Sequence, residues 1–196
     1  MPDWLPWVLV AAGTVLAAAV MVAFLRRRFS ALPRKFAAVT PGALYRSGQG
    51  SAAQFRRAVE QYGIKTIICL RRLKPGRTSR WFREETSTAE RLGVHFVHFP
   101  IVKNEVPPPA QVRDVLSVIA DPARRPVLVH CARGEQRTGF FVAAHRLIVD
   151  GWPLAQAVAE LESFGCPAAE KVRAVQALRA LVAEHQNKSS GSGDPT

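Results

Sequence analysis

Short apolar runs and amphipathic stretches alternate along the central part of the chain. The apolar runs have the length and composition of buried strands, and they cover residues 43–47, 64–71, 94–101 and 126–131. The stretches between and after them have helical character, and the predicted helices cover residues 51–62, 81–92, 109–120, 139–149, 153–164 and 167–184. Because strands that alternate with helices form parallel pairs, the pattern predicts an α/β fold with a mostly parallel central sheet and helices on both faces.

Residues 4–25 precede this pattern and contain no charged side chain. As a helix they would span about 33 Å, compared with about 30 Å of bilayer hydrocarbon. Trp4 and Trp7 stand where an aromatic belt would lie, and three arginines follow at residues 26–28. A cleaved signal peptide would carry its positive charge before the apolar run. The segment therefore predicts one transmembrane helix, with the rest of the chain in the cytoplasm as a single-pass membrane protein.

The flanking segments set the expected domain boundaries. Residues 26–40 carry five positive charges and no acidic residue, which predicts a basic juxtamembrane linker that can lie against anionic lipid. Residues 187–196 form a polar tail rich in glycine and serine, which we expect to be disordered. The α/β domain is expected between them, at residues 41–186.

Charge and cysteine content narrow the possible partners. The chain has 196 residues, with 27 Lys and Arg against 15 Asp and Glu, for a net charge of +12. Such an excess indicates an acidic partner such as a phosphorylated substrate or anionic lipid. The three cysteines, Cys69, Cys131 and Cys166, show neither a CxxC pair nor zinc-ligand spacing. We therefore expect no disulfide framework, no metal and a reducing compartment.

The stretch "PVLVHCARGEQRTGFF", residues 126–141, carries the candidate chemistry. A loop between a buried strand and a helix N-terminus gathers unpaired N–H groups that bind anions. Gly134 can adopt a positive φ, and Gly139 lets the start of the helix pack closely. Arg137 offers a planar fork for two phosphate oxygens. The same positive field lowers the pKa of the Cys131 thiol, which predicts a nucleophile that faces a bound phosphoryl group.

Residues 130–139 match the pattern HCxxGxxRTG, and in this the chain resembles the cysteine-dependent tyrosine and dual-specificity phosphatases. It is most similar to the atypical dual-specificity group of plants, fungi and bacteria. The resemblance extends to "LYRSGQ" at residues 44–49, "YGIKTIICLR" at 62–71 and the "HFPI" strand end, and it covers residues 43–164. It implies the cysteine phosphatase fold and phosphomonoester hydrolysis through a cysteinyl-phosphate intermediate, without a cofactor.

The resemblance also implies roles for the residues of the motif. Cys131 would be the nucleophile, Arg137 would bind the phosphate oxygens, and Thr138 would donate to the departing thiolate. His130 and Gly139 would support the loop. The phosphate would be bound by residues 131–137, called the phosphate loop here, through Ala132, Arg133, Gly134, Glu135, Gln136 and Arg137.

The family also uses a general acid, normally an Asp on a loop ahead of the phosphate loop. Between residues 99 and 113 the one carboxylate is Glu105, which makes it the first candidate. Asp114, expected inside a helix, is the second, and Glu135 is the third.

Two residues outside the motif are further candidates. Cys69 lies near the end of a strand that can neighbour the one ending at Cys131, which suggests a redox partner for the nucleophile, as in some lipid phosphatases of the superfamily. Arg71 begins a basic segment, residues 71–83, and could steer an anionic substrate toward the site.

The substrate stays open at this stage. A phosphotyrosine-containing protein is the first expectation and a membrane phospholipid head group the second, whereas nucleic acid is not expected. Glu135 adds negative charge to the phosphate loop and argues against the most highly phosphorylated substrates. An inactive phosphate-binding adaptor is kept as an alternative, because of Gln136 and because the motif itself does not identify the general acid. A rhodanese-like sulfurtransferase is disfavoured because its cysteine loop usually lacks the Arg-Thr-Gly ending.

Overall fold

The computed structural model describes residues 12–22, 32–73, 76 and 79–191, with side chains to Lys188. The chain divides into two units, Met1–Ala31 and Leu32–Thr196. In the first unit, residues 12–22 are helical and exposed. The predicted transmembrane segment, residues 4–25, lies half outside the described residues. Among those that are described, no helix is both long and apolar enough to cross a bilayer.

The second unit is built on a five-stranded sheet. Its strands are β1 (Ala37–Thr40), β2 (Leu44–Ser47), β3 (Thr66–Arg71), β4 (His95–Ile101) and β5 (Val127–His130). The order across the sheet is β1-β2-β5-β3-β4, and all neighbours are parallel except β1 and β2. The predicted α/β fold with a mostly parallel sheet is therefore confirmed.

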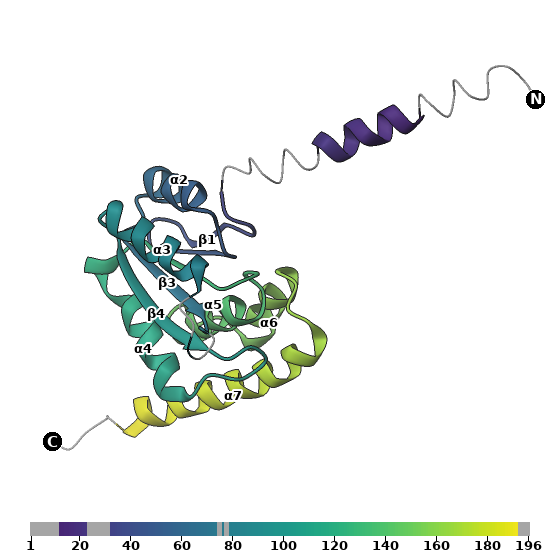
Figure 1. Ribbon diagram of the computed structural model, residues 1–196. Coiled ribbons are helices and arrows are strands. Elements are labelled where there is room, and N and C mark those ends of the chain that lie inside the picture. The colour runs from purple at the N-terminus through teal and green to yellow at the C-terminus, as the bar shows by residue number, and fades with distance from the viewer. Residues whose placement is uncertain (1–11, 23–31, 74–75, 77–78, 192–196) are drawn as a thin grey trace, which may run out of the picture. The chain divides into compact units, whose positions relative to one another are not determined.

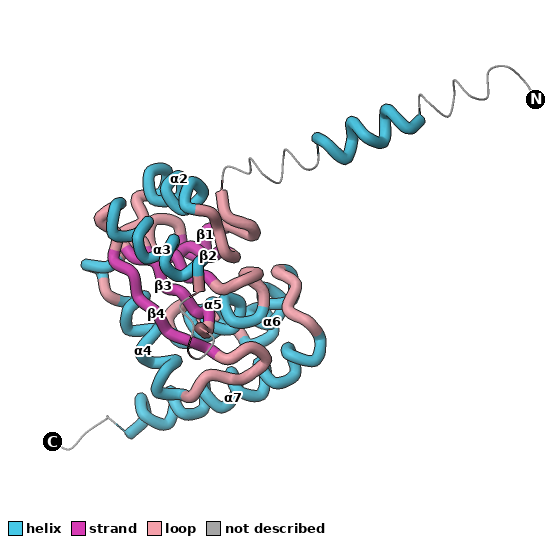
Figure 2. The backbone as a smooth tube through the Cα atoms, viewed as in Figure 1, coloured by secondary structure: helices cyan, strands magenta, loops and turns pink. Residues whose placement is uncertain are grey.

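Helices cover both faces of this sheet (Figures 1 and 2). Helices α2 (Ala52–Tyr62) and α3 (Arg80–Arg91) pack on one face, over an apolar cluster that includes Ile67 and Leu128. The other face, with Ile68 and Val129, packs against the remaining helices. These are α4 (Pro109–Ala120), α5 (Gln136–Ile148), α6 (Leu154–Ser163) and α7 (Ala168–Gly191), with a short 3₁₀ helix at Pro122–Arg124 after α4.

Helix α5 is buried almost all round, because it lies between the sheet and the helices α4, α6 and α7. Its central residues 139–144 are accordingly all apolar, and Phe141 and Ala144 have no exposed surface. A helix held in this way fixes the position of the loop that leads into it from β5.

The structure differs from the sequence prediction at three boundaries. Residues 37–40, expected in the basic linker, form β1, because they pair with β2 and Val39 is buried in the core. Helix α7 continues to Gly191, into the tail expected to be disordered, and Glu184 and Lys188 form an ion pair one turn apart on it. Helix α5 begins at Gln136, three residues before the predicted start.

Candidate active site

Cys131 follows directly after β5 at the carboxyl end of the sheet, and its side chain is buried. Gly134 has a φ of 76°, as the sequence predicted. A Cβ at this position would lie 2.7 Å from the Gly48 nitrogen and 2.8 Å from the Ser47 carbonyl oxygen. The phosphate loop is therefore pressed against the turn after β2, and the conformation and the contact both require glycine.

The surroundings of the Cys131 sulfur favour the thiolate. Burial acts against the charge, but hydrogen bonds from the Thr138 hydroxyl and N–H, the charge on Arg137 and the Gly134 N–H together lower the pKa of the thiol. The Gly134 nitrogen lies 3.3 Å from the sulfur. These contacts thus favour the thiolate form of Cys131, in a cavity that Arg133 and Arg137 also line.

Arg137 joins the phosphate loop to the ends of two other strands. Its guanidinium donates to the Leu70 carbonyl oxygen at 3.3 Å and to the Ile101 carbonyl oxygen at 3.2 Å. These contacts use the Nη1 atom, and the side chain also lines the cavity above Cys131. Arg137 is therefore oriented by the sheet before any anion binds.

Two cavities adjoin the phosphate loop. The first, of about 350 Å³ and called the Cys131 cavity here, is lined by Cys131, Arg133, Gln136, Arg137, Pro167 and Glu170, among others. The second, of about 390 Å³ and called the basic cavity, is lined by Arg71, Arg72, Leu73, Val102, Lys103, Ala132 and Arg137. Lys103, Ala132 and Arg137 line both, so a bound molecule can extend from one cavity into the other.

Glu135, which the sequence placed as an uncompensated negative charge, is paired. The Lys35 ammonium lies 2.8 Å from its carboxylate and also donates to the Phe164 carbonyl oxygen at 2.5 Å, and Arg133 lies 3.5 Å from the carboxylate. Burial opposes ionisation of Glu135, but these cations lower its pKa. The residue holds the phosphate loop to the N-terminal segment and leaves little net negative charge in the site.

Arg46 is a second support that sequence reasoning missed. Its buried guanidinium donates to the Gly134 carbonyl oxygen at 2.9 Å and lies 3.6 Å above the Phe164 ring. Burial lowers its pKa to about 10, against the opposing influence of Glu160 and Cys131. The sequence feature that could have identified Arg46 is an arginine within a predicted strand, in the "LYRSGQ" segment.

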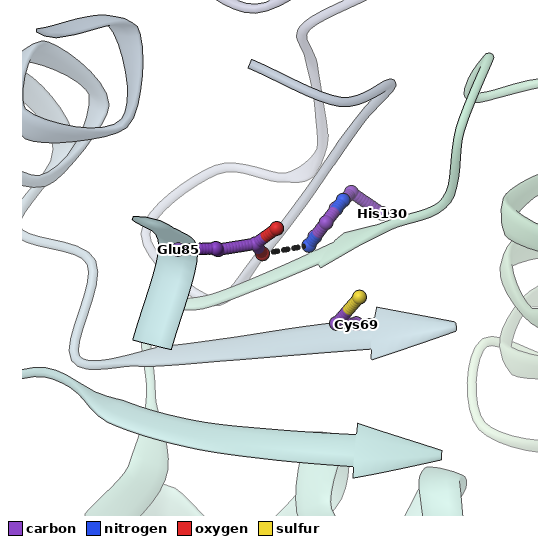
Figure 3. A group of neighbouring side chains, drawn as sticks. All are labelled: Cys69, Glu85 and His130. Atoms are coloured by element: carbon purple, nitrogen blue, oxygen red, sulfur yellow. Dashed lines mark ion pairs between the residues drawn. The ribbon is translucent and has the colours of Figure 1, made fainter. Parts of the chain in front are cut away.

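His130 lies beneath the phosphate loop and is fully buried. One ring nitrogen faces the Cys131 carbonyl oxygen at 3.4 Å, and the other forms an ion pair with Glu85 of α3 at 2.5 Å (Figure 3). Burial disfavours its charge, but Glu85, with Cys69 adding to the effect, raises the pKa of the imidazole well above its ordinary value. Its burial and its contact with Glu85 make His130 a support under the loop rather than a group exposed to substrate.

Cys69 completes this buried group on the same face of the sheet, since it pairs with His130 across β3 and β5. Cys69, Glu85 and His130 place their ligand atoms within 4.8 Å of one another, the one such cluster found in the described part of the chain. A tetrahedral zinc would hold two ligands about 3.3 Å apart. Because the His130 and Glu85 atoms are in direct contact, the cluster is an ion pair with a neighbouring thiol. The redox pairing of Cys69 with Cys131 stays a prediction.

Arg71 is linked to the same network through Gln49. The Gln49 amide donates to Glu85 at 2.7 Å and accepts from Arg71 at 2.7 Å, and the Arg71 guanidinium stacks 3.6 Å from the Trp81 ring centre. Arg71 is thus held at the wall of the basic cavity, and its role in steering the substrate stays a prediction.

The three candidate acids lie at different places. Glu105 is exposed and lines a small cleft that also contains Val106 and Phe140, and it does not line the Cys131 cavity. Asp114 is inside α4 and exposed, as expected. Glu135 lines the Cys131 cavity, but it is held by Lys35. Glu170 of α7, which sequence reasoning missed because it lies 39 residues after Cys131 and outside the motif, lines the cavity too.

Comparison with known proteins agrees with this geometry. A family model described as "DSP-PTPase phosphatase fused to NAD+ Kinase" matches residues 34–188. Inositol diphosphatase DSP1 of rice, Oryza sativa subsp. japonica, is 31% identical over 142 residues, which is 72% of this chain and 60% of that protein. Dual specificity protein phosphatase TpbA of Pseudomonas aeruginosa is 40% identical over 57 residues, which is 29% of this chain and 26% of TpbA. The chain thus spans less than two thirds of the length of these relatives.

Among solved structures, the catalytic core of the PP-IP phosphatase Siw14 from Saccharomyces cerevisiae, in complex with citrate, has the same fold. The TM-score is 0.67 at 22% identity, over 82% of this chain and 93% of that one. The family match covers both the sheet and the phosphate loop. The chain therefore belongs to the DSP-PTPase phosphatase family described above, within the superfamily of cysteine-dependent tyrosine and dual-specificity phosphatases.

Proposed function

We propose that Cys131 is the nucleophile of this phosphatase and that Arg137 binds the phosphoryl oxygens. The thiolate attacks phosphorus, the bond from phosphorus to the leaving oxygen breaks, and a cysteinyl phosphate forms. Arg137 and the N–H groups of the phosphate loop stabilise the charge on the three equatorial oxygens. Water then attacks phosphorus and the Cys131 thiolate departs, with the Thr138 hydroxyl placed to donate to it.

We further propose that the preferred substrate carries more than one phosphoryl group. The basic cavity is the observation that carries this proposal, because it presents Arg71, Arg72 and Lys103 beside the place where the first phosphoryl group would bind. A phosphotyrosine side chain would leave these cations unused, whereas a second phosphate one or two bonds away would reach them.

An inositol diphosphate is the first candidate of that class. Rice DSP1, which is named as an inositol diphosphatase, matches 72% of this chain. Glu135 was the sequence argument against such a substrate, and its pairing with Lys35 and Arg133 weakens that argument. When the thiolate attacks the terminal phosphorus of a diphosphate, the leaving group is the inner phosphate, which needs little protonation. Such a substrate suits a site in which Glu105, the first candidate acid, does not line the Cys131 cavity.

A phosphotyrosine-containing protein is the second candidate. It is supported by the 40% identity to TpbA, which is named as a dual specificity protein phosphatase. The Cys131 cavity, at about 350 Å³, is large enough for an aryl phosphate.

The test compares kcat/KM for an inositol diphosphate and for a phosphotyrosine peptide. We expect the wild type to prefer the diphosphate. We also expect Arg72→Ala, a change at an exposed side chain, to lower kcat/KM at least about tenfold for the diphosphate, because it removes one phosphate contact. The peptide should be affected little. A preference for the peptide, with Arg72→Ala acting equally on both substrates, would assign the chain to the second candidate.

A further inference from the structure

Hydrolysis of a cysteinyl phosphate needs a group that takes a proton from the attacking water. Such a group must lie in the Cys131 cavity, on the side of phosphorus opposite the sulfur. It must also be a free base when the intermediate has formed. This need rests on the proposed function and is independent of which phosphorylated substrate is the natural one.

Two carboxylates line the Cys131 cavity, those of Glu135 and Glu170. Glu135 is bound by Lys35 at 2.8 Å and by Arg133 at 3.5 Å, so that each of its oxygens faces a cation and its pKa is lowered. Glu105 is exposed and lines the smaller cleft beyond the cavity. Glu170 is therefore the carboxylate in this cavity that is not committed to another contact.

The position of Glu170 suits a base. It lies in the first turn of α7, so the start of this helix places it at the cavity wall. The next residue, Lys171, is engaged with Glu162 at 2.7 Å, and within the described residues no ion pair or hydrogen bond involves the side chain of Glu170. Its side chain is half-buried, and Pro167, just before α7, lines the same cavity.

The negative charge of Glu170 also acts on Cys166, at the edge of the site. The buried thiol of Cys166 has a raised pKa, first because of burial and then because of the charges of Glu170 and Glu135. Glu170 is therefore close enough to Cys166, the residue before Pro167, for its charge to act on that thiol.

We propose that Glu170 is the catalytic base of the second half of the reaction. As the water oxygen bonds to phosphorus, one water proton moves to the Glu170 carboxylate, the phosphorus–sulfur bond breaks, and its electron pair returns to the Cys131 thiolate. Inorganic phosphate leaves, and Glu170 loses its proton to solvent. This role makes Glu170 a third participant beside Cys131 and Arg137.

The test is rapid-mixing kinetics of the full chain with p-nitrophenyl phosphate, whose leaving group needs no acid. In Glu170→Gln we expect a burst of about one equivalent of p-nitrophenol at the wild-type rate, followed by a steady state about 100-fold slower than the wild type. Glu60→Gln makes the same change at an exposed carboxylate of α2 that lines neither cavity, and as the matched control it should leave both phases unchanged.

Each other outcome for Glu170→Gln contradicts the proposal. An unchanged steady state would exclude Glu170 as the base, and an equal slowing of the burst and the steady state would assign it a structural or first-step role. Failure of the proposed function looks different, because the wild type itself would then release no p-nitrophenol, or Cys131→Ser would release it as fast as the wild type.

Discussion

Burial and hydrogen bonding act in opposite directions on the Cys131 thiol. Burial disfavours the thiolate, whereas Thr138, Arg137 and Gly134 favour it. The net effect is a lowered pKa of the thiol. The charge that the nucleophile needs thus depends on contacts within one short loop.

Removing the Thr138 hydroxyl should raise the pKa of Cys131. We expect the alkylation of Cys131 by iodoacetate to have its midpoint below the ordinary thiol value of about 8.5 in the wild type, and to shift upward in Thr138→Val. Mass spectrometry of the labelled Cys131 peptide at a series of pH values measures this. Thr138→Ser keeps the hydroxyl and is the control, and equal midpoints in the wild type and Thr138→Val would refute the assignment.

Gly134→Ala should disable the phosphate loop. The positive φ costs about 1–3 kcal/mol for a residue with a side chain, and the new Cβ would also meet the backbone at Gly48. We expect a lower free energy of unfolding in urea and a loss of more than about 100-fold in kcat/KM. Gly151→Ala is the matched control, because its φ is 66° with no atom within 4 Å. It should lose stability but keep activity, and a fully active Gly134→Ala would contradict this account.

Some residues of the site belong to one short sequence motif, whereas others are brought to it only by the fold. The phosphate loop is one continuous segment with a recognisable spacing, so Cys131, Gly134 and Arg137 could be predicted from the sequence. Arg46 and Glu85 act on that loop from other strands and helices, and their role follows from tertiary packing. No pattern within a short window of sequence identifies such partners.

At the scale of elements, the phosphate loop is supported from three sides. The turn after β2 contacts Gly134, His130 and Glu85 lie below, and Lys35 reaches Glu135 from the segment before β1. The order of the other strands and the helices could be predicted from hydrophobic periodicity. Strand β1 could not be predicted, because its four residues follow a run of basic residues that is typical of a linker.

Breaking the Lys35–Glu135 pair should weaken substrate binding. In Lys35→Met the carboxylate is left without its main cation beside the phosphate loop, so we expect KM for p-nitrophenyl phosphate to rise about fivefold, or about 1 kcal/mol. Glu135→Gln in the same chain should restore KM to near the wild-type value. Additive effects of the two changes would show that the contact at 2.8 Å has no influence on binding.

At the scale of the whole molecule, the catalytic unit begins earlier than the sequence suggested. The compact unit starts at Leu32, and Phe36 packs against Tyr45 and Tyr62 with ring centres 5.6 and 4.7 Å apart. The membrane anchor at residues 4–25 stays a prediction. The boundary near residue 32 is set by packing. It could not be predicted from the sequence, because residues 26–40 have the basic composition of a linker.

Truncation tests this boundary. A chain that begins at Leu32 should unfold cooperatively in urea, and one that begins at Pro41 should be less stable by at least about 2 kcal/mol. The second loses the buried Val39, the Phe36 packing and the Lys35 ion pair. Equal stability of the two chains would show that residues 32–40 are a linker after all.

The central claim is that Cys131 carries the reaction, and one measurement tests it most directly. Hydrolysis of p-nitrophenyl phosphate by the full chain is compared with hydrolysis by Cys131→Ser, which changes one atom in the site. We predict measurable turnover in the wild type and a fall to the uncatalysed background in Cys131→Ser. Turnover that survives this substitution would contradict the account.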